Sequence, residues 1–146
     1  MRHREVETEA EYLARMETGN DWREEIETLA DREAVDAGWF AAMGAVRTAE
    51  LWFYDQREKE YHAVEFDEPL EVAACVGNVS LLDGERFAHT HAVLSRENGQ
   101  SLAGHLDSAR VFAGEVYLRE FAEPLERAHD ERTDLDLWLN DDPDTE

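Results

Sequence analysis

Three histidines have the types and spacing of a metal site. His89 and His91 stand in the apolar run 87–94, and His105 stands in the run 102–106. Because positions i and i+2 of an extended strand project to the same face, His89 and His91 place two imidazoles side by side. Three neutral imidazoles around one ion leave a coordination position open for water, a substrate or another protein's group. The pattern predicts zinc or another divalent transition metal at His89, His91 and His105. Ordinary half-buried histidines that are satisfied by hydrogen bonds are the alternative.

The length of one turn decides whether the third histidine can join the other two. Residues 97–99 read Glu-Asn-Gly, and asparagine and glycine tolerate the positive φ that hairpin loops require. If all three residues form the loop, Arg96 pairs with Gln100. His91 then faces His105 on the same side of the hairpin. A two-residue Asn-Gly loop would shift the register by one and send His105 to the opposite face.

Length and cysteine content narrow the class of protein. A chain of 146 residues fits one domain with a substantial core. The single Cys75 lies in an apolar run, so it cannot form a disulfide within the chain and is expected to pack as a small hydrophobe. The N-terminus leads into acidic sequence, and no run of 18 apolar residues occurs. We expect no signal peptide, no membrane span and a location in the reducing cytoplasm.

The charge balance is extreme. Asp and Glu number 36 against 14 Lys and Arg, which gives a net charge of -22, and Lys59 is the one lysine. Such surfaces resemble those of halophilic archaea, and a solvated surface is a more economical interpretation of the acidic runs than an acidic-substrate or cation-storage role. Binding to nucleic acid rests on neutralising phosphates with Lys and Arg, so this charge disfavours DNA as a partner.

Hydrophobic periodicity predicts which elements position the histidines. A short strand is expected at 12–16, and a helix opens at Asp21, where Glu24 three residues later has the form of a capping box. Apolar residues recur at helical spacing from there to Asp36. Further strands are expected at 40–46, 49–54, 61–66, 70–82, 87–95, 100–106 and 111–121. Almost all of these strands could be joined antiparallel. Residues 140–146 are too polar to fold against a core and are expected to form an acidic disordered tail.

From about Tyr12 to Trp138 the sequence resembles the plants-and-prokaryotes conserved (PPC) domain, which in plants accompanies AT-hook segments. The resemblance rests on the order of several short motifs: Gly44-Ala45-Val46, Tyr54-Asp55, residues 77–84, His89-Thr90-His91, Gly104-His105-Leu106, Ala113-Gly114-Glu115-Val116 and Leu135-Asp136-Leu137-Trp138. It implies one α+β domain over residues 1–139, in which a mostly antiparallel twisted sheet of about seven strands carries one main helix near the N-terminus.

The resemblance also implies a homotrimer and a metal ion, zinc foremost, on the clustered histidines of prokaryotic members. A trimer would give Trp39, Trp52 and Trp138 a place at interfaces, where large aromatic residues are favoured, although the core of the monomer is an equal alternative. DNA is a possible partner by this resemblance. However, no Arg-Gly-Arg-Pro AT-hook precedes the domain, and Glu-Pro-Leu-Glu at 68–71 replaces the plant Gly-Arg-Phe-Glu segment.

Two functions from different classes follow. One is a trimeric module, nominally DNA-binding or regulatory, in which metal or ligand at the histidines tunes assembly. The other is a metal-dependent enzyme, since zinc held by three histidines can lower the pKa of its water to about 7. An enzyme also needs a proton-transfer group, for which Glu115 and Asp107 are candidates, although Glu115 also fits a solvated strand carboxylate. The sequence has no phosphate-binding loop, nucleophile elbow or Cys-x-x-Cys motif and does not decide whether the protein is an enzyme.

Overall fold

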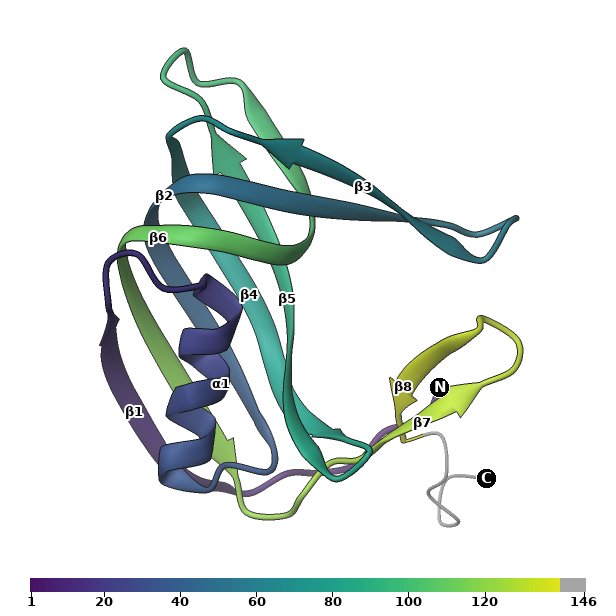
Figure 1. The fold of residues 1–146 in the computed structure, drawn as a ribbon. Coiled ribbons are helices and arrows are strands. Elements are labelled where there is room, and N and C mark those ends of the chain that lie inside the picture. The colour runs from purple at the N-terminus through teal and green to yellow at the C-terminus, as the bar shows by residue number, and fades with distance from the viewer. Residues whose placement is uncertain (140–146) are drawn as a thin grey trace.

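Long antiparallel strands and one helix make up the described part of the protein (Figure 1). The computed structural model of the chain describes residues 1–139. Its elements are β1 (Thr8–Met16), α1 (Trp22–Glu33), β2 (Gly38–Asp55), β3 (Glu60–Phe66), β4 (Leu70–Leu82), β5 (Glu85–Ser95), β6 (Ser101–Phe121), β7 (Arg127–Asp130) and β8 (Leu135–Trp138). The α+β class with one helix near the N-terminus is confirmed. The tail expected at 140–146 lies outside the described residues.

The main sheet has the strand order β1-β6-β5-β4-β2-β3, and an additional pairing joins β2 to β6. The pairs β2–β4, β4–β5, β5–β6 and β6–β2 are all antiparallel and together form a closed ring. Ring closure is possible because β6 changes neighbours along its length: residues 101–105 pair with β5, and residues 105–120 pair with β2. The ring leaves β1 and β3 as edge strands.

The strand boundaries differ from the expected ones in two ways. The strands expected at 40–46 and 49–54 are one strand, β2, and those expected at 100–106 and 111–121 are one strand, β6. Register shifts between Ala45 and Thr48 interrupt the β2–β6 ladder between the two segments of β2 that were expected as separate strands, so the chain bulges and continues. The small hairpin of β7 and β8 was not anticipated as a pair of strands.

Asp21 starts the helix and fastens it to the sheet. Its Oδ1 accepts hydrogen bonds from the backbone N–H groups of Arg23 (2.9 Å) and Glu24 (3.1 Å), as an N-cap does. Its Oδ2 accepts a third bond from the N–H of Ala109 in β6, at 2.9 Å. The helix ends at Glu33, before the expected Asp36, because Ala34 adopts the left-handed conformation with φ 59°.

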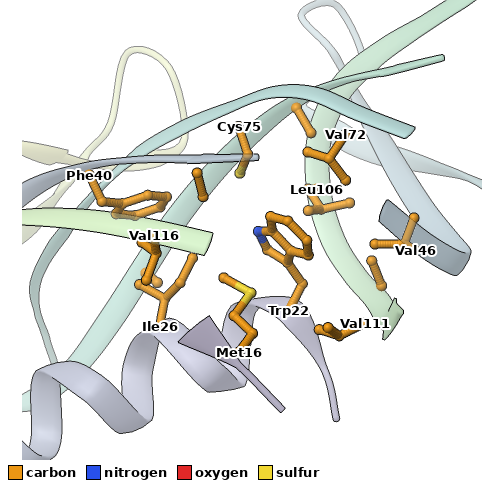
Figure 2. Close-up of a cluster of buried hydrophobic side chains, with 14 of the residues drawn as sticks. Met16, Trp22, Ile26, Phe40, Val46, Val72, Cys75, Leu106, Val111 and Val116 are labelled. Atoms are coloured by element: carbon orange, nitrogen blue, oxygen red, sulfur yellow. The ribbon is translucent and has the colours of Figure 1, made fainter. Parts of the chain in front are cut away.

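The core lies between α1 and the inner face of the ring (Figure 2). Trp22 and Ile26 of the helix and Phe40 of β2 are fully buried there. Cys75 is 1% exposed, and burial raises the pKa of its thiol to about 11, so it packs as the small hydrophobe that was predicted. Among residues 1–139, no helix has the length and apolar character that crossing a membrane requires.

Candidate metal centre

The turn between β5 and β6 has the three-residue form that brings the histidines together. Arg96 donates its backbone N–H to the carbonyl of Gln100 at 3.0 Å, and Gly99 donates back to the carbonyl of Arg96 at 2.8 Å. This register places His91 directly opposite His105 in the β5–β6 ladder. The two-residue alternative, which would have separated them, is excluded.

The three imidazoles gather on the outer face of the ring. In β5 the side chains of Ala88, Thr90 and Ala92 are buried, so the alternating residues His89 and His91 face away from the core. His89, His91 and His105 each offer a ring nitrogen, and these nitrogens lie within 4.8 Å of one another. Their ring centroids are 5.1 to 5.5 Å apart. Ligand nitrogens on a tetrahedral zinc are about 3.3 Å apart, given Zn–N bonds of about 2.0 Å, so small side-chain rotations would complete such a set.

His89 and His105 face a hollow of about 340 Å³ that is walled by several elements. The β2–β3 arm contributes Trp52 and Tyr61, whose rings lie 6.0 and 5.6 Å from the ring of His105. The hairpin of β7 and β8 forms the facing wall, and Arg23 comes from the helix. The rest of the lining is Leu82, Phe87, Asp107, Arg127, Asp134, Leu135, Asp136 and Leu137.

The β2–β3 arm and the β7–β8 hairpin come from distant parts of the sequence and extend to the same side of the molecule (Figure 1). The hydroxyl of Tyr54 donates to the carbonyl of Thr133 at 2.7 Å. The Nζ of Lys59 donates to the carbonyl of Glu131 at 3.2 Å. These contacts hold the arm and the hairpin on either side of the histidines.

The surroundings keep the histidines uncharged. Burial, followed by the charge of Arg127, lowers the pKa of His89 to about 3. Burial also lowers the pKa of His105 to about 4, and it lowers that of His91. All three imidazoles are therefore neutral at pH 7, as metal ligands must be.

The histidine cluster contains a buried polar atom that lacks a partner. Among the described residues, the Nδ1 of His105 is buried and makes no hydrogen bond. A buried polar atom without a partner carries a desolvation penalty, which a metal ion or an ordered ligand would relieve. The donor set, its neutrality and this unpartnered nitrogen fit a divalent transition metal.

Arg127 is the main residue of the site that sequence reasoning missed. Its Nε donates to Ser80 at 2.8 Å, and its Nη2 donates to Asn78 at 2.6 Å and approaches the Nδ1 of His89 at 3.4 Å. Burial lowers the pKa of this guanidinium. An isolated arginine in a polar stretch gives no sequence signal, because its place depends on how the β7–β8 hairpin folds back over β4 and β5.

The two candidate carboxylates lie in different places. Asp107 follows His105 by two residues, lines the same hollow, and has a pKa raised by burial. Glu115 is exposed and lines a separate groove with Leu13 and Met43, so the structure does not bring it to the histidines.

Other sequence candidates lie outside the cluster. His62 groups with Asp55 and Glu58 at the tip of the β2–β3 arm. Of the tryptophans, Trp39 is 45% exposed and Trp138 packs against Arg127 at 5.8 Å, so neither belongs to the buried core.

Comparisons with known proteins agree with this fold. The family model of the Plants and Prokaryotes Conserved (PCC) domain matches residues 3–122. Among curated proteins, none matches the sequence. A solved structure of a metal-containing protein from Archaeoglobus fulgidus is 41% identical, with a TM-score of 0.91 over 95% of this chain and 99% of that chain.

Two further structures are similar over most of their length. A plant- and prokaryote-conserved protein from Pyrococcus horikoshii is 29% identical, with a TM-score of 0.88 over 94% of this chain and 96% of that chain. A protein from Bacteroides thetaiotaomicron, provisionally described as DNA-binding, is 22% identical with a TM-score of 0.83 over 91% of this chain and 96% of that chain. The family model covers well over half of the chain, so this protein belongs to the Plants and Prokaryotes Conserved domain family.

Proposed function

We propose that His89, His91 and His105 of one chain bind a divalent transition metal, zinc first, and that the function of the protein resides at this centre. The observation that carries the proposal is the set of three neutral imidazole nitrogens within 4.8 Å of one another beside a hollow. The metal-containing relative from Archaeoglobus fulgidus, at 41% identity, supports it.

Elemental analysis of protein purified without an affinity metal tests this proposal. The wild type should carry about one metal ion per chain, and the triple variant His89→Ala, His91→Ala, His105→Ala should carry none. The matched control is His3→Ala, His62→Ala, His129→Ala, which removes the same number of imidazoles elsewhere and should retain the metal. Metal lost from the control but kept by the site variant would refute the assignment.

The hollow beside the histidines favours a metal-dependent enzyme that acts on a small molecule. When bound, a zinc ion held by three histidines polarises a carbonyl or lowers the pKa of a bound water to about 7. Asp107 lines the hollow two residues from His105, and a carboxyl with a raised pKa is suited to accepting and returning a proton. An Asp107→Asn variant should keep its metal and lose turnover in a screen of small esters, amides and carbonyl compounds.

We assign DNA binding a lower rank for this chain, despite the provisional description of its relative. The net charge of -22 would repel a polyanion at low salt, where such binding is strongest. Fluorescence anisotropy with duplex DNA at 0.05 and 2 M KCl tests this ranking. Salt-dependent binding at micromolar protein would reverse it.

The proposal also includes a homotrimer of single-domain chains (residues 1–139) in the cytoplasm. The homotrimer is supported by an apolar groove on the outer face of β1, β2 and β4. Leu13, Met43 and Val76 in this groove are 85%, 59% and 43% exposed. Exposed apolar surface of this kind is typical of a protein interface. Light scattering should give a mass of three chains for the wild type and a smaller mass for Met43→Glu.

A further inference from the structure

Arg127 places a permanent positive charge beside the three histidines. An arginine side chain stays protonated in proteins, and burying it without a counter-ion is costly. Among the residues that the structure describes, no carboxylate lies within ion-pair distance of Arg127, although the carboxylate of Asp136 attracts it from farther away. Its hydrogen-bond acceptors at Ser80, Asn78 and the backbone carbonyl of Asp136 are all neutral.

We propose that the hollow binds a small carboxylate with an apolar body, whose carboxylate group lies between Arg127 and the metal. This inference rests on the proposed metal site and names the class of ligand that the site takes. Three features of the hollow support it: the donors of Arg127, the charge of the lining and the character of the walls.

The donors of Arg127 are not all used. A guanidinium has five N–H groups, of which three donate to neutral acceptors on Ser80, Asn78 and the backbone carbonyl of Asp136, at 2.6 to 2.8 Å. A fourth approaches the Nδ1 of His89 at 3.4 Å, which is a long contact. The fifth has no acceptor among residues 1–139.

A metal ion would free the fourth donor as well. Since arginine can only donate, the contact requires an unprotonated Nδ1 on His89. A metal bound through Nδ1 of His89 would occupy the lone pair that accepts from Arg127. A metal bound through Nε2 would leave the proton on Nδ1, facing the N–H of Arg127. In either case metal binding breaks the Arg127–His89 contact and leaves an Nη2 N–H group next to His89 without an acceptor, in addition to the unused N–H of Nη1.

A divalent ion beside Arg127 would bring three positive charges together next to His89. Of the other charged residues in the lining, Arg23 already pairs with Glu27 at 3.9 Å, and the carboxylate of Asp136 attracts Arg127 without forming an ion pair with it. A monocarboxylate supplies one negative charge, and its two oxygens match the paired donors of a guanidinium.

The walls favour an apolar body attached to that carboxylate. The lining includes the rings of Trp52, Tyr61 and Phe87 and the side chains of Leu135 and Leu137. A hollow of about 340 Å³ accommodates a ligand with the bulk of a single aromatic ring.

Aromatic contacts also hold the guanidinium in place. Its central carbon lies 5.7 Å from the ring of Phe87 and 5.8 Å from the ring of Trp138. Arg127 is therefore fixed before a ligand arrives, which lowers the cost of ordering it on binding.

Benzoate and its neutral counterpart benzamide test the inference, because they share a shape and differ in charge. Calorimetric titrations would use metal-loaded protein in a buffer free of carboxylates. Benzoate should bind the wild type at least tenfold more tightly than benzamide does. Arg127→Gln should lower the benzoate affinity at least tenfold and leave the benzamide affinity unchanged. The matched control Arg119→Gln removes an arginine that pairs with Glu11 on β1, and it should behave as wild type.

Equal affinities for benzoate and benzamide in the wild type would overturn the inference without any variant. Tighter, Arg127-dependent binding of inorganic phosphate would overturn the carboxylate assignment. If Arg127→Gln fails to fold, Arg127→Lys keeps the charge and should keep the preference for benzoate. A wild type without metal would refute the metal site itself, whereas metal-loaded protein with equal benzoate affinity in wild type and Arg127→Gln would refute only the carboxylate inference.

Discussion

Replacing Thr90 with valine tests how the core holds the histidines in register. Thr90 lies between His89 and His91, its side chain is fully buried, and its hydroxyl donates to the backbone carbonyl of Leu106. The β5–β6 ladder stops at the pair His91–His105, so this side-chain bond is the next link between the two strands. It joins the residue between two candidate ligands to the residue that follows the third.

Valine keeps the shape of threonine and removes the hydroxyl. The carbonyl of Leu106 would then stay buried without this donor, which costs about 1–3 kcal/mol of unfolding free energy. For a domain of this size, such a loss lowers the midpoint of thermal unfolding by about 3–9 °C. Because the variant lacks the Thr90–Leu106 hydrogen bond that joins β5 to β6 beside His91 and His105, its zinc affinity should be roughly tenfold lower.

Urea unfolding followed by circular dichroism in EDTA gives the stability, and competition with a chromophoric chelator gives the zinc affinity. Thr90→Ser is the matched control, since it keeps the hydroxyl and loses a buried methyl group, at a cost of about 1 kcal/mol. The serine variant should bind zinc as wild type does. The reasoning is refuted if Thr90→Val is as stable as wild type, or if both variants lose zinc affinity equally.

Three further predictions concern acid, glycine and salt. In metal-free protein, the folded pKa values of His89 (about 3) and His105 (about 4) lie below the unfolded value of about 6.5, so the free energy of unfolding should fall as pH drops from 6.5 toward 4. The double variant His89→Gln, His105→Gln should flatten this dependence when stability is measured by urea unfolding at each pH. The same slope of stability against pH in wild type and variant would contradict the prediction. Gly77→Ala should lower the free energy of unfolding by about 1–3 kcal/mol in the same assay, because the added Cβ would lie 2.1 Å from the carbonyl oxygen of His89 and 2.4 Å from the ring of Phe40. Unchanged stability would show that β5 can shift freely. Raising KCl from 0.1 to 2 M should raise the thermal midpoint by screening the net charge of -22, and a lower midpoint in salt would rule out self-repulsion as the dominant effect.

The sequence predicted the fold class and the helix start for identifiable physical reasons. The cap at Asp21 is a local interaction, so residue types within four positions were sufficient to place it. Alternation of apolar and polar residues likewise predicted β4 over residues 70–82 as the structure has it. The merged strands β2 and β6 were missed because a bulge and a turn both interrupt the alternation locally, and only the pairing with a distant strand tells them apart.

By itself the sequence determined that His89 and His91 share one face, since that follows from the two-residue period of any strand. It left open whether His105 would join them, because the answer depended on one residue of loop length, which the Arg96–Gln100 hydrogen bond decides. The sequence did not predict that Arg127 contacts His89, because this contact depends on how the separate β7–β8 hairpin packs. Local periodicity can be read along a chain, whereas the charge and shape of a site arise where segments distant in sequence come together in space.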